Sequence, residues 1–576
     1  MHFAIPEPWI VHARFRYAGT VNLAVGSIGF LVLLACAYRF YGRFVARRFG
    51  IDDARATPAH TKQDGVDFVP TKPFYLFAQH FSAIAAAGPI AGPILACQMF
   101  GWMPCLLWIG LGVVFIGAVH DFASLIASVR HGGCSIAEIA RERLGTPAGR
   151  AMMAFIWIAL IYVIVAFADI TAGSFARGTE ELESAGVHFN PGGAVAAASV
   201  MYLGLSVVLG IVQKMFNPPL WLVTVIFVPA TFALSWLGTH MADVFVFDTR
   251  TWGLIILAYC ALASVVPVWA LLQPRGYLGG FVLYSALALG VIGVLFGHYD
   301  IQQPAFITYD TTKTGGAMFP FLFVTIACGA CSGFHGLVCS GTTSKQVDRE
   351  SHAPFVGYGG MLAEAFVALI ALVTVAICTT GELKGLKPGS VYGNGIGRFM
   401  TLIIGRDNLG FAITFGAMAF STFVFDTLDV ATRLGRYLLQ ELFVWKGLAG
   451  ATAGTLLTVA PAALFIAYGG EGAYQKFWQL FGASNQLLAA LTLASIAVWL
   501  RKEGKSNVFV LVPMAFVLAI TLWALVALAI ANARASTGFD VPLANAITAS
   551  ALVLLALFFT SISLRELRAA APQVAT

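Results

Sequence analysis

The sequence predicts an all-α polytopic membrane protein with about 15 transmembrane helices. Of its 576 residues, 59% are hydrophobic and 11% are charged, whereas a soluble protein carries about 25% charged residues. Apolar runs of roughly 20 residues, the length that crosses the hydrocarbon core of a bilayer, recur along the whole chain. No long polar block separates these runs, so we expect no appended soluble domain.

The expected spans are joined by short connections. They lie near residues 18–40, 74–100, 104–130, 150–174, 192–212, 218–238, 252–272, 277–297, 319–341, 357–379, 409–432, 448–468, 477–500, 508–532 and 541–564. The first run is interpreted as a transmembrane helix and not as a cleaved signal peptide, because Arg39, Arg43 and Arg47 follow it closely.

The basic residues test this segmentation, because Lys and Arg accumulate in cytoplasmic loops. If the N-terminus is outside, the loops on the cytoplasmic side hold 23 of the 34 basic residues. We therefore expect an outside N-terminus and a cytoplasmic C-terminus. This topology explains the net charge of +6, so no nucleic-acid partner is invoked.

Two of these spans are expected to be broken by their glycine and proline residues. Residues 74–98 carry Gly88, Pro89, Gly92 and Pro93, and each backbone carbonyl that proline frees in hydrocarbon needs another partner. Residues 252–272 contain Ser264 and Pro267, so we expect a break near the middle of that span as well. Five helices separate the two breaks, as an inverted five-plus-five repeat would require; the alternative is a proline kink that affects only packing.

The absence of two sequence motifs narrows the classes of function, including the energy source that transport could use. There is no G-x-x-x-x-G-K-[ST] loop for ATP and no H-E-x-x-H motif of a metalloprotease. Gradient-driven transport, passive conduction and an unusual membrane enzyme remain.

Ionisable residues inside spans are costly and are usually retained for function. The candidates are Asp121, Asp169, Glu364, Asp426, Asp429, His80, His120 and His335. Asp121 could bind and release a proton while His120 contacts a neighbouring helix. The alternative for this pair is a buried polar bridge that fixes helix packing.

The segment around His335 ends in the hydroxyl-rich tail Ser340 to Ser344. The hydroxyls of this tail, which include those of Thr342 and Thr343, suit a hard cation or the ammonium of Lys345 in its place. Ordinary capping of the helix C-terminus explains these hydroxyls equally well. Cys328, Cys331, His335 and Cys339 share one helical stripe, but a stripe this long cannot surround one zinc ion without a break. We therefore expect no metal there and read the cysteines as small buried hydrophobes.

Late in the chain, Asp426 and Asp429 share a helix face with Arg433 and Arg436. The spacing predicts an ion pair between Asp429 and Arg433. Such a pair acts either as a gate latch or as a structural clamp on a helix end, and the sequence favours the clamp.

The assembled motifs closely resemble the carbon starvation protein A family of inner-membrane uptake transporters. The motifs are Asp52-Asp53, Thr57 to Ala59, Asp64 to Pro70, His80-Phe81, Ala87 to Pro93, Gly117 to Phe122, Pro267 to Trp269, Gln273 to Arg275, Ser332 to His335, Ser340 to Lys345, Asp429 to Arg436 and Phe481 to Leu488. They cover about residues 38 to 500. One departure is Gln79, where the family commonly has a histidine.

This resemblance implies a secondary transporter of the bacterial inner membrane, related to the amino acid–polyamine–organocation superfamily, with a LeuT-like inverted repeat. It also implies proton-coupled uptake of short peptides or pyruvate during nutrient limitation, with no cofactor. A passive channel, or a membrane enzyme that uses His120 and Asp121, is the alternative.

Combining both lines, we expect three parts: residues 1–72 with the first helix and a cytoplasmic loop, the transport core 73–440, and additional C-terminal helices in 441–576. Core helices one to five are placed on the second to sixth spans, and six to ten on the seventh to eleventh. The expected substrate-binding residues are His80, Ala87, Gly88, Pro89, Gly92, Ser264 and Pro267. The expected proton or ion coupling residues are His120, Asp121, His335, Thr342, Thr343 and Lys345, and the expected gate or clamp residues are Asp426, Asp429 and Arg433.

Overall fold

Helices make up almost all regular structure in the computed structural model, which describes residues 22–64, 67–85, 87–176, 190–309, 317–469 and 474–569. Within these ranges the β-structure is one isolated parallel bridge, between Thr71 and Val347. Twelve helical segments are long and apolar enough to cross a membrane, and the bent pair α4 and α5 adds a thirteenth span if it is counted as one. The fold class is therefore an all-helical protein with many membrane spans.

The helices follow one another with short connections. Their bounds are α1 (Leu23–Ala37), α2 (Arg43–Phe49), α3 (Pro58–Thr61), α4 (Pro73–Ile84), α5 (Gly88–Phe100), α6 (Trp102–Gly112), α7 (Ala118–Arg130), α8 (Ile136–Leu144), α9 (Thr146–Phe175), α10 (Pro191–Phe216), α11 (Leu220–His240), α12 (Thr249–Val265), α13 (Leu272–Phe296), α14 (Met318–Thr325), α15 (Gly333–Gly341), α16 (Gly359–Ala376), α17 (Pro388–Ile404), α18 (Leu409–Phe443), α19 (Gly447–Tyr468), α20 (Tyr474–Lys502), α21 (Val508–Ala535) and α22 (Val541–Ala569). Short turns carry the labels η1 (Tyr38–Gly42), η2 (Val113–Gly117), η5 (Val268–Ala270), η6 (Thr343–Gln346), η7 (Glu350–His352), η8 (Pro354–Tyr358) and η9 (Arg406–Asn408).

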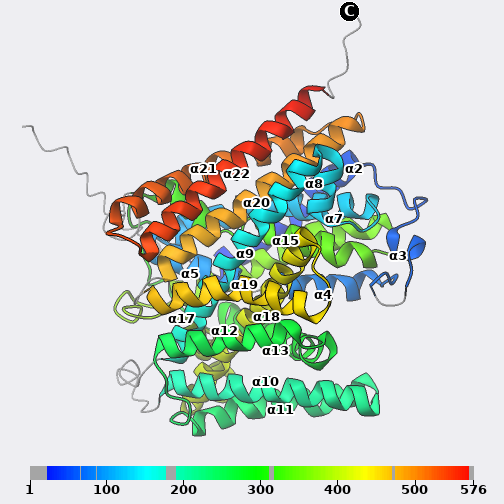
Figure 1. The fold of residues 1–576 in the computed structure, drawn as a ribbon. Coiled ribbons are helices and arrows are strands. Elements are labelled where there is room, and N and C mark those ends of the chain that lie inside the picture. Colours follow the sequence, from blue (N-terminus) through cyan, green and yellow to red (C-terminus); the bar gives the residue numbers. More distant parts are fainter. Residues whose placement is uncertain are drawn as a thin grey trace, which may run out of the picture.

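The bundle has a buried centre, and the apolar helices at its flanks are largely exposed. In Figure 1, α10 and α11 lie at the bottom of the view and α21 and α22 at the top, with the other helices between them. The apolar window of α20 is 100% buried, whereas those of α21 and α22 are 28% buried and that of α11 is 22% buried. The flanking pairs therefore shield the central helices, as expected for helices whose outer face contacts lipid.

One buried helix was missed by the sequence prediction. Helix α17 contains Gly389, Gly393, Gly395 and Gly397, and it packs along α18. A Cβ on Gly393 would lie 2.8 Å from the Cβ of Ala417, so the two backbones are close. Because glycine and polar residues make this segment only moderately apolar, a search for apolar runs did not find it.

The expected break in the middle of residues 252–272 is wrong. Helix α12 ends at Val265, Val266 is extended (φ −69°, ψ 143°), and α13 begins at Leu272. The residue before proline disfavours the α conformation, so Pro267 ends one helix ahead of the next. The interrupted segment is residues 319–341 instead, where α14 and α15 are separated by non-helical residues 326–332.

The two interrupted segments contact each other. Helices α4 and α5 meet at an angle of 47°, and α5 packs against α14 while α4 packs against α15. A Cβ on Gly92 would lie 2.7 Å from the carbonyl oxygen of Thr325, and one on Gly88 would lie 2.4 Å from the Sγ of Cys328. Glycine at these two positions therefore lets the first break approach the second.

Several loops with basic residues meet at one end of the bundle. The buried carboxylate of Glu350 contacts Arg130 Nη2 at 2.9 Å and Arg55 Nη1 at 2.8 Å, and it accepts a hydrogen bond from the backbone N–H of Asp52. Lys502 donates to the carbonyl of Arg143. These contacts join loops that were expected, from their basic residues, on the same side of the membrane.

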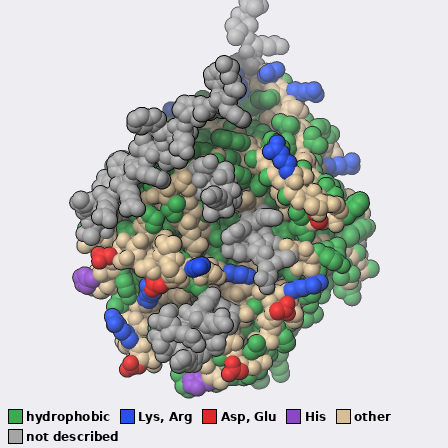
Figure 2. Space-filling view, turned by 90° about the vertical axis from the view of Figure 1, so that its left-hand side faces the viewer, with side chains coloured by type: hydrophobic (Ala, Val, Ile, Leu, Met, Phe, Trp, Pro, Cys, Tyr) green, Lys and Arg blue, Asp and Glu red, His purple; other side chains and the backbone are tan. Residues whose placement is uncertain are grey.

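Figure 2 shows the bundle from the left-hand side of Figure 1. On this face Lys, Arg, Asp and Glu side chains are scattered among uncharged groups, and hydrophobic side chains cover its right-hand flank. Large hydrophobic residues are exposed on the outer helices α11, α21 and α22 as well, among them Leu220, Val512 and Leu554.

Candidate functional site

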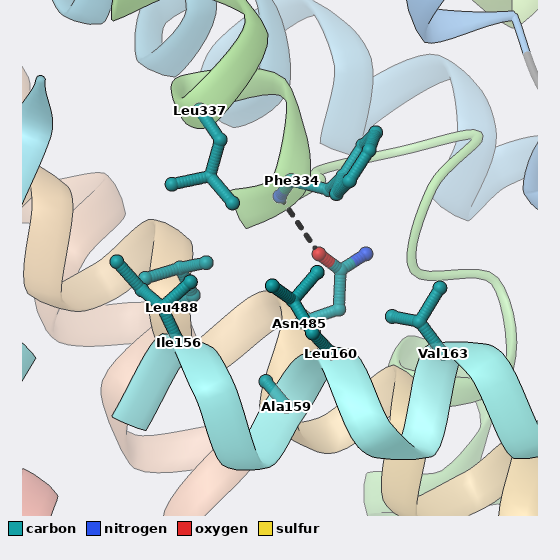
Figure 3. Close-up of a pocket in the computed structure, with 8 residues that line it drawn as sticks. All are labelled: Ile156, Ala159, Leu160, Val163, Phe334, Leu337, Asn485 and Leu488. Carbon is teal, nitrogen blue, oxygen red and sulfur yellow. Dashed lines mark hydrogen bonds between the residues drawn. The ribbon is translucent and has the colours of Figure 1, made fainter. Parts of the chain in front are cut away.

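The candidate site is built where the two interrupted segments meet, and fixed hydrogen bonds hold the second break open. Helix α15 begins at Gly333 without a cap from its own N-cap residue Ser332. The side chain of Asn485, on α20, accepts a hydrogen bond of 2.8 Å from the N–H of Phe334, as Figure 3 shows. Its amide nitrogen donates to Ser332 Oγ at 3.1 Å and contacts Cys328 Sγ at 3.3 Å. Asn485 therefore caps α15 from a different helix.

The carbonyls at the end of α14 are satisfied in the same way. Trp478 Nε1 donates to Thr325 O at 3.0 Å, and Gln486 Nε2 donates to Phe323 O at 2.9 Å. Trp108 Nε1 donates to Ile326 O at 3.1 Å. Because unpaired carbonyls are costly in a membrane interior, these side chains explain why residues 326–332 remain non-helical.

A small apolar cavity lies next to the Asn485 cap. Four α9 side chains line it, facing Phe334 and Leu337 of α15 and Leu488 of α20 (Figure 3). The four are Ile156, Ala159, Leu160 and Val163. The sequence prediction missed both the cavity and the cap, although the motif Phe481 to Leu488 marked the position of Asn485.

A chain of buried acids and imidazoles starts at the third residue of α15, His335. Its Nδ1 lies 2.8 Å from Asp121 Oδ2, and its Nε2 lies 3.1 Å from Glu364 Oε2. The other oxygen of Asp121 is 2.8 Å from Nδ1 of His120. All four side chains are at most 1% exposed. The structure thus brings together α7, α15 and α16 around one imidazole with a carboxylate on each side.

The predicted set of coupling residues was incomplete. His120, Asp121 and His335 were predicted as coupling residues and do lie together, but Glu364 appeared only among the intramembrane acids. Its position on α16 places it against the far side of His335. Among the described residues, neither oxygen of Glu364 has a hydrogen bond of good geometry, so its contact with His335 is the interaction that can neutralise it.

His80 connects the first interrupted segment to the hydroxyl-rich tail. Its Nδ1 lies 2.9 Å from Thr343 Oγ1, and the residue is 1% exposed. A Cβ on Gly360 would lie 2.9 Å from Cδ2 of His80, so α16 approaches this imidazole closely. Within the described residues, Nε2 of His80 has no hydrogen-bond partner.

The remaining tail residues make local contacts. Thr342 Oγ1 donates to Val338 O at 3.1 Å, which is the capping interaction considered as the alternative. Lys345 Nζ lies 3.7 Å from Asp67 Oδ2 and 5.3 Å from the ring centre of Phe68. Lys345 therefore joins the loop between α3 and α4 to η6. Its ammonium contacts that loop and not the hydroxyls of the tail Ser340 to Ser344.

Ser264, which precedes Pro267 at the end of α12, is held by other helices. Ser264 Oγ lies 3.1 Å from Thr455 Oγ1 of α19, and its carbonyl accepts a 2.6 Å hydrogen bond from Arg436 Nη1. Arg433 Nη2 donates to Ala263 O and Val266 O. Because α12 ends here, the two arginines clamp its C-terminal carbonyls.

The predicted ion pair between Asp429 and Arg433 is wrong. Arg433 binds the end of α12, and Asp429 instead contacts the guanidinium of Arg275, a fully buried residue of α13. Arg275 also contacts Asp426 at 2.8 Å. The sequence search overlooked Arg275 because it expected this residue in a cytoplasmic loop before the helix.

No group of three or more His, Cys, Asp or Glu side chains within the described ranges is arranged to hold a metal ion. Cys328, Cys331 and Cys339 are all buried.

The comparisons with known proteins agree on one family. A family profile described as "Carbon starvation protein CstA" matches residues 23–394 and 383–524. A relative from Campylobacter jejuni, named peptide transporter CstA, is 33% identical over 87% of this chain and 80% of its own length. A relative from Escherichia coli, named pyruvate/proton symporter BtsT, is 31% identical over 89% of this chain and 82% of its own.

Among solved structures, a manganese transporter from Eremococcus coleocola aligns with 88% of this chain and 99% of its own, at 13% identity and a TM-score of 0.47. The family assignment comes from the sequence matches, which extend over most of the described helices and include the residues of both interrupted segments. The chain belongs to the carbon starvation protein CstA family and is a membrane transporter.

Proposed function

We propose that this protein imports a small carboxylate-bearing substrate, a short peptide or pyruvate, together with protons during nutrient limitation. The observation that carries the proposal is the buried chain Asp121, His335 and Glu364, which begins at the second helix break. Support comes from the relatives, which are named peptide transporters and a pyruvate/proton symporter.

The charges of the buried chain explain why it would bind protons. Two carboxylates around a neutral imidazole leave two uncompensated negative charges, and each buried charge costs several kcal/mol. One proton on His335 makes an imidazolium that both carboxylates contact, and a second on Glu364 makes the group neutral. We infer that His335 shares a proton between Asp121 and Glu364, since histidine binds and releases protons near neutral pH. His120 orients Asp121 from the other side.

The substrate would bind at the first break. Helix α5 starts at Gly88, and its N-terminal N–H groups, with the preceding Ala87 and with Pro89 in the first turn, form an end that favours a carboxylate. His80 lies one turn before the break and offers its unpaired Nε2. Gly92 belongs to this site through the close packing of α5 on α14. Thr342 and Thr343 would border the site through the contact of Thr343 with His80. Ser264 takes a structural role, because α18 and α19 hold it. Pro267 takes one as well, because it ends α12.

We infer a five-plus-five inverted repeat with a different assignment from the sequence prediction. The first set is α4 with α5, α6 with α7, α9, α12 and α13; the second is α14 with α15, α16, α18, α19 and α20. Equivalent members make equivalent contacts. Helix α5 packs on α16, as α15 packs on α7. Helix α13 packs on α17 and on α18, as α20 packs on α8 and on α9. The π-helical turns η2 and η8 also fall at corresponding places.

This assignment moves the proposed boundary of the core. It extends from residue 73 to the end of α20 at Lys502, and α10 with α11 forms an inserted hairpin. Helices α1 and α2 precede the core and α21 and α22 follow it. We propose that the N-terminus is outside and the C-terminus cytoplasmic in a bacterial inner membrane, with the loops around Glu350 and Lys502 in the cytoplasm.

Uptake into proteoliposomes tests the proposal. Labelled pyruvate and a labelled dipeptide are offered separately, with and without an inward proton gradient. We expect accumulation of one of them above its outside concentration only when the gradient is present, and recovery of the label chemically intact. Uptake that merely equilibrates would indicate a channel, and altered label would indicate an enzyme that uses His120 and Asp121. Accumulation that requires a sodium gradient in place of the proton gradient would exclude proton coupling.

A further inference from the structure

A second group of buried charges lies apart from the proposed transport site. Arg275 of α13 contacts two carboxylates of α18: its Nε and Nη2 each lie 2.8 Å from Asp426 Oδ1, and its Nη1 contacts Asp429 Oδ2. The hydroxyl of Tyr259, on α12, donates to Asp429 Oδ2 at 2.9 Å and accepts from Arg275 Nη1 at 2.6 Å. We call these four residues the Arg275 cluster.

The charges of the Arg275 cluster do not balance. One guanidinium faces two carboxylates, which leaves a net charge of −1 when both acids are ionised. Arg275 is fully buried and the side chain of Asp429 is 2% exposed, and a buried charge that lacks a partner neutralises itself by binding a proton. Asp429 Oδ1 has no hydrogen-bond partner among the described residues, so one oxygen of the pair is free to carry a proton.

Within the described part of the chain, no second cation acts on the two carboxylates. The titratable groups that act on the two carboxylates are Arg275 and Tyr259, with Tyr202 of α10 and Cys260 of α12 near them. Tyr202 donates its hydroxyl hydrogen to the carbonyl of Arg275. The two arginines of α18, Arg433 and Arg436, donate to carbonyls of α12 and so are not available to the carboxylates. From α9, α11, α17 and α19, the described residues contribute no hydrogen bond to either carboxylate.

A route for proton exchange exists on one side. The side chain of Asp426 is 24% exposed, whereas Asp429 is buried. The second carboxylate oxygen of Asp426, Oδ2, lies beside Gly279, where an added Cβ would be 3.1 Å from it. A proton can therefore reach the pair through Asp426 and be shared with Asp429.

We propose that the Arg275 cluster is a second proton-binding site, in which the pair Asp426 and Asp429 holds one exchangeable proton. The proton belongs to the pair, because both carboxylates interact with the same guanidinium. Its release makes both acids ionic and strengthens the connection of α13 and α12 to α18. The site is separate from the chain Asp121, His335 and Glu364. The inference therefore does not depend on the identity of the proposed substrate.

Infrared spectroscopy of the purified full-length protein tests this inference. The C=O stretching band of a protonated carboxylic acid is followed during a pH titration of the wild-type protein, Asp426→Asn and Asp429→Asn. Each substitution leaves one acid for one guanidinium, so we expect the wild-type band that belongs to the pair to disappear in both variants. Asp121→Asn, which alters the other buried chain, is the matched control and keeps this band.

Retention of the band in either Asp426→Asn or Asp429→Asn would overturn the proposal. If an asparagine variant does not fold, Tyr259→Phe gives a second test. It removes the hydroxyl that donates to Asp429, so the ionised form loses a hydrogen bond and the midpoint of the band should shift to higher pH. An unchanged midpoint in Tyr259→Phe would also contradict the inference.

Discussion

His335 Nδ1 lies 2.8 Å from Asp121 Oδ2, although 214 residues separate the two in sequence. Asp121 lies in α7, which belongs to an uninterrupted span, whereas His335 lies at the start of the half-helix α15. A movement of α15 against α7 would therefore change this contact directly. Such a contact can couple the charge of Asp121 to the position of an interrupted helix.

The first prediction is that Asp121→Asn strongly reduces proton-driven accumulation. A hydrogen bond to a charged group is worth about 1.5–3 kcal/mol, so we expect uptake driven by a pH gradient to fall about 10- to 100-fold. Exchange of substrate without a gradient should persist, because the substrate is expected at the first break. Both rates are measured in proteoliposomes.

Ser124→Ala is the control for this substitution. Ser124 is also buried on α7, and its hydroxyl has no hydrogen-bond partner among the described residues. It should accumulate substrate as the wild type does. Undiminished accumulation by Asp121→Asn would show that the buried chain serves packing alone.

The second prediction concerns the contact between the interrupted helices. Gly92→Ala places a Cβ 2.7 Å from the backbone oxygen of Thr325, which cannot rotate away as a side chain would. Overpacking of this kind costs about 1–3 kcal/mol, so the melting temperature in detergent should fall by several degrees. Gly280→Ala, on α13, has open space around its Cβ and should melt as the wild type does. Equal melting of the two variants would mean that α5 and α14 are not packed this closely.

How much of the fold could be predicted from sequence depended on composition. Uniformly apolar helices such as α9 and α21 were found because each crosses a membrane with few charges. Helix α17 was missed because its glycines allow close packing on α18 but make the segment less hydrophobic. The wrong break at Pro267 shows that a proline in an apolar run marks a helix end as readily as an interruption, and only the position of the next helix distinguishes the two.

The candidate site was predicted in part. His120, Asp121 and His335 could be recognised individually because ionisable residues are rare inside spans. Their contacts depend on how α7, α15 and α16 pack, which no local pattern reports. The same reason explains the missed partner of Asp429: the spacing to Arg433 fits an ion pair, but Arg433 satisfies the carbonyls at the end of α12 and leaves Asp429 to Arg275.

The third prediction is that Asn485→Ala destabilises the second break. Loss of a helix cap costs about 1 kcal/mol, and a buried N–H left unpaired raises the cost to about 1–3 kcal/mol. The variant should therefore melt at a lower temperature and unfold at lower denaturant concentration. Asn532→Ala removes a buried asparagine whose side chain donates to Leu528 O of its own helix, and we expect a smaller effect from it. A larger effect of Asn532→Ala would argue against the capping role of Asn485.

The fourth prediction is a pH dependence of stability at His131, which follows α7 outside the membrane span. Burial lowers the pKa of His131 below its ordinary value of 6.5. Its Nε2 accepts a 2.9 Å hydrogen bond from Arg143 Nε, and its Nδ1 lies 2.7 Å from Ala127 O. Both contacts suit the neutral imidazole with its proton on Nδ1, since the protonated ring would oppose the guanidinium of Arg143.

The sign of the effect follows from linkage. Because the folded pKa is depressed, the stabilisation is present above pH 6.5 and is lost as the pH falls toward the folded pKa. The melting temperature should therefore drop between pH 7.5 and pH 5.5, and His131→Gln, which stays neutral and can still donate and accept, should show a smaller drop. His240→Gln, at the exposed end of α11, should retain the wild-type pH dependence. An identical pH dependence of His131→Gln and the wild type would assign the drop to other groups and remove His131 as its cause.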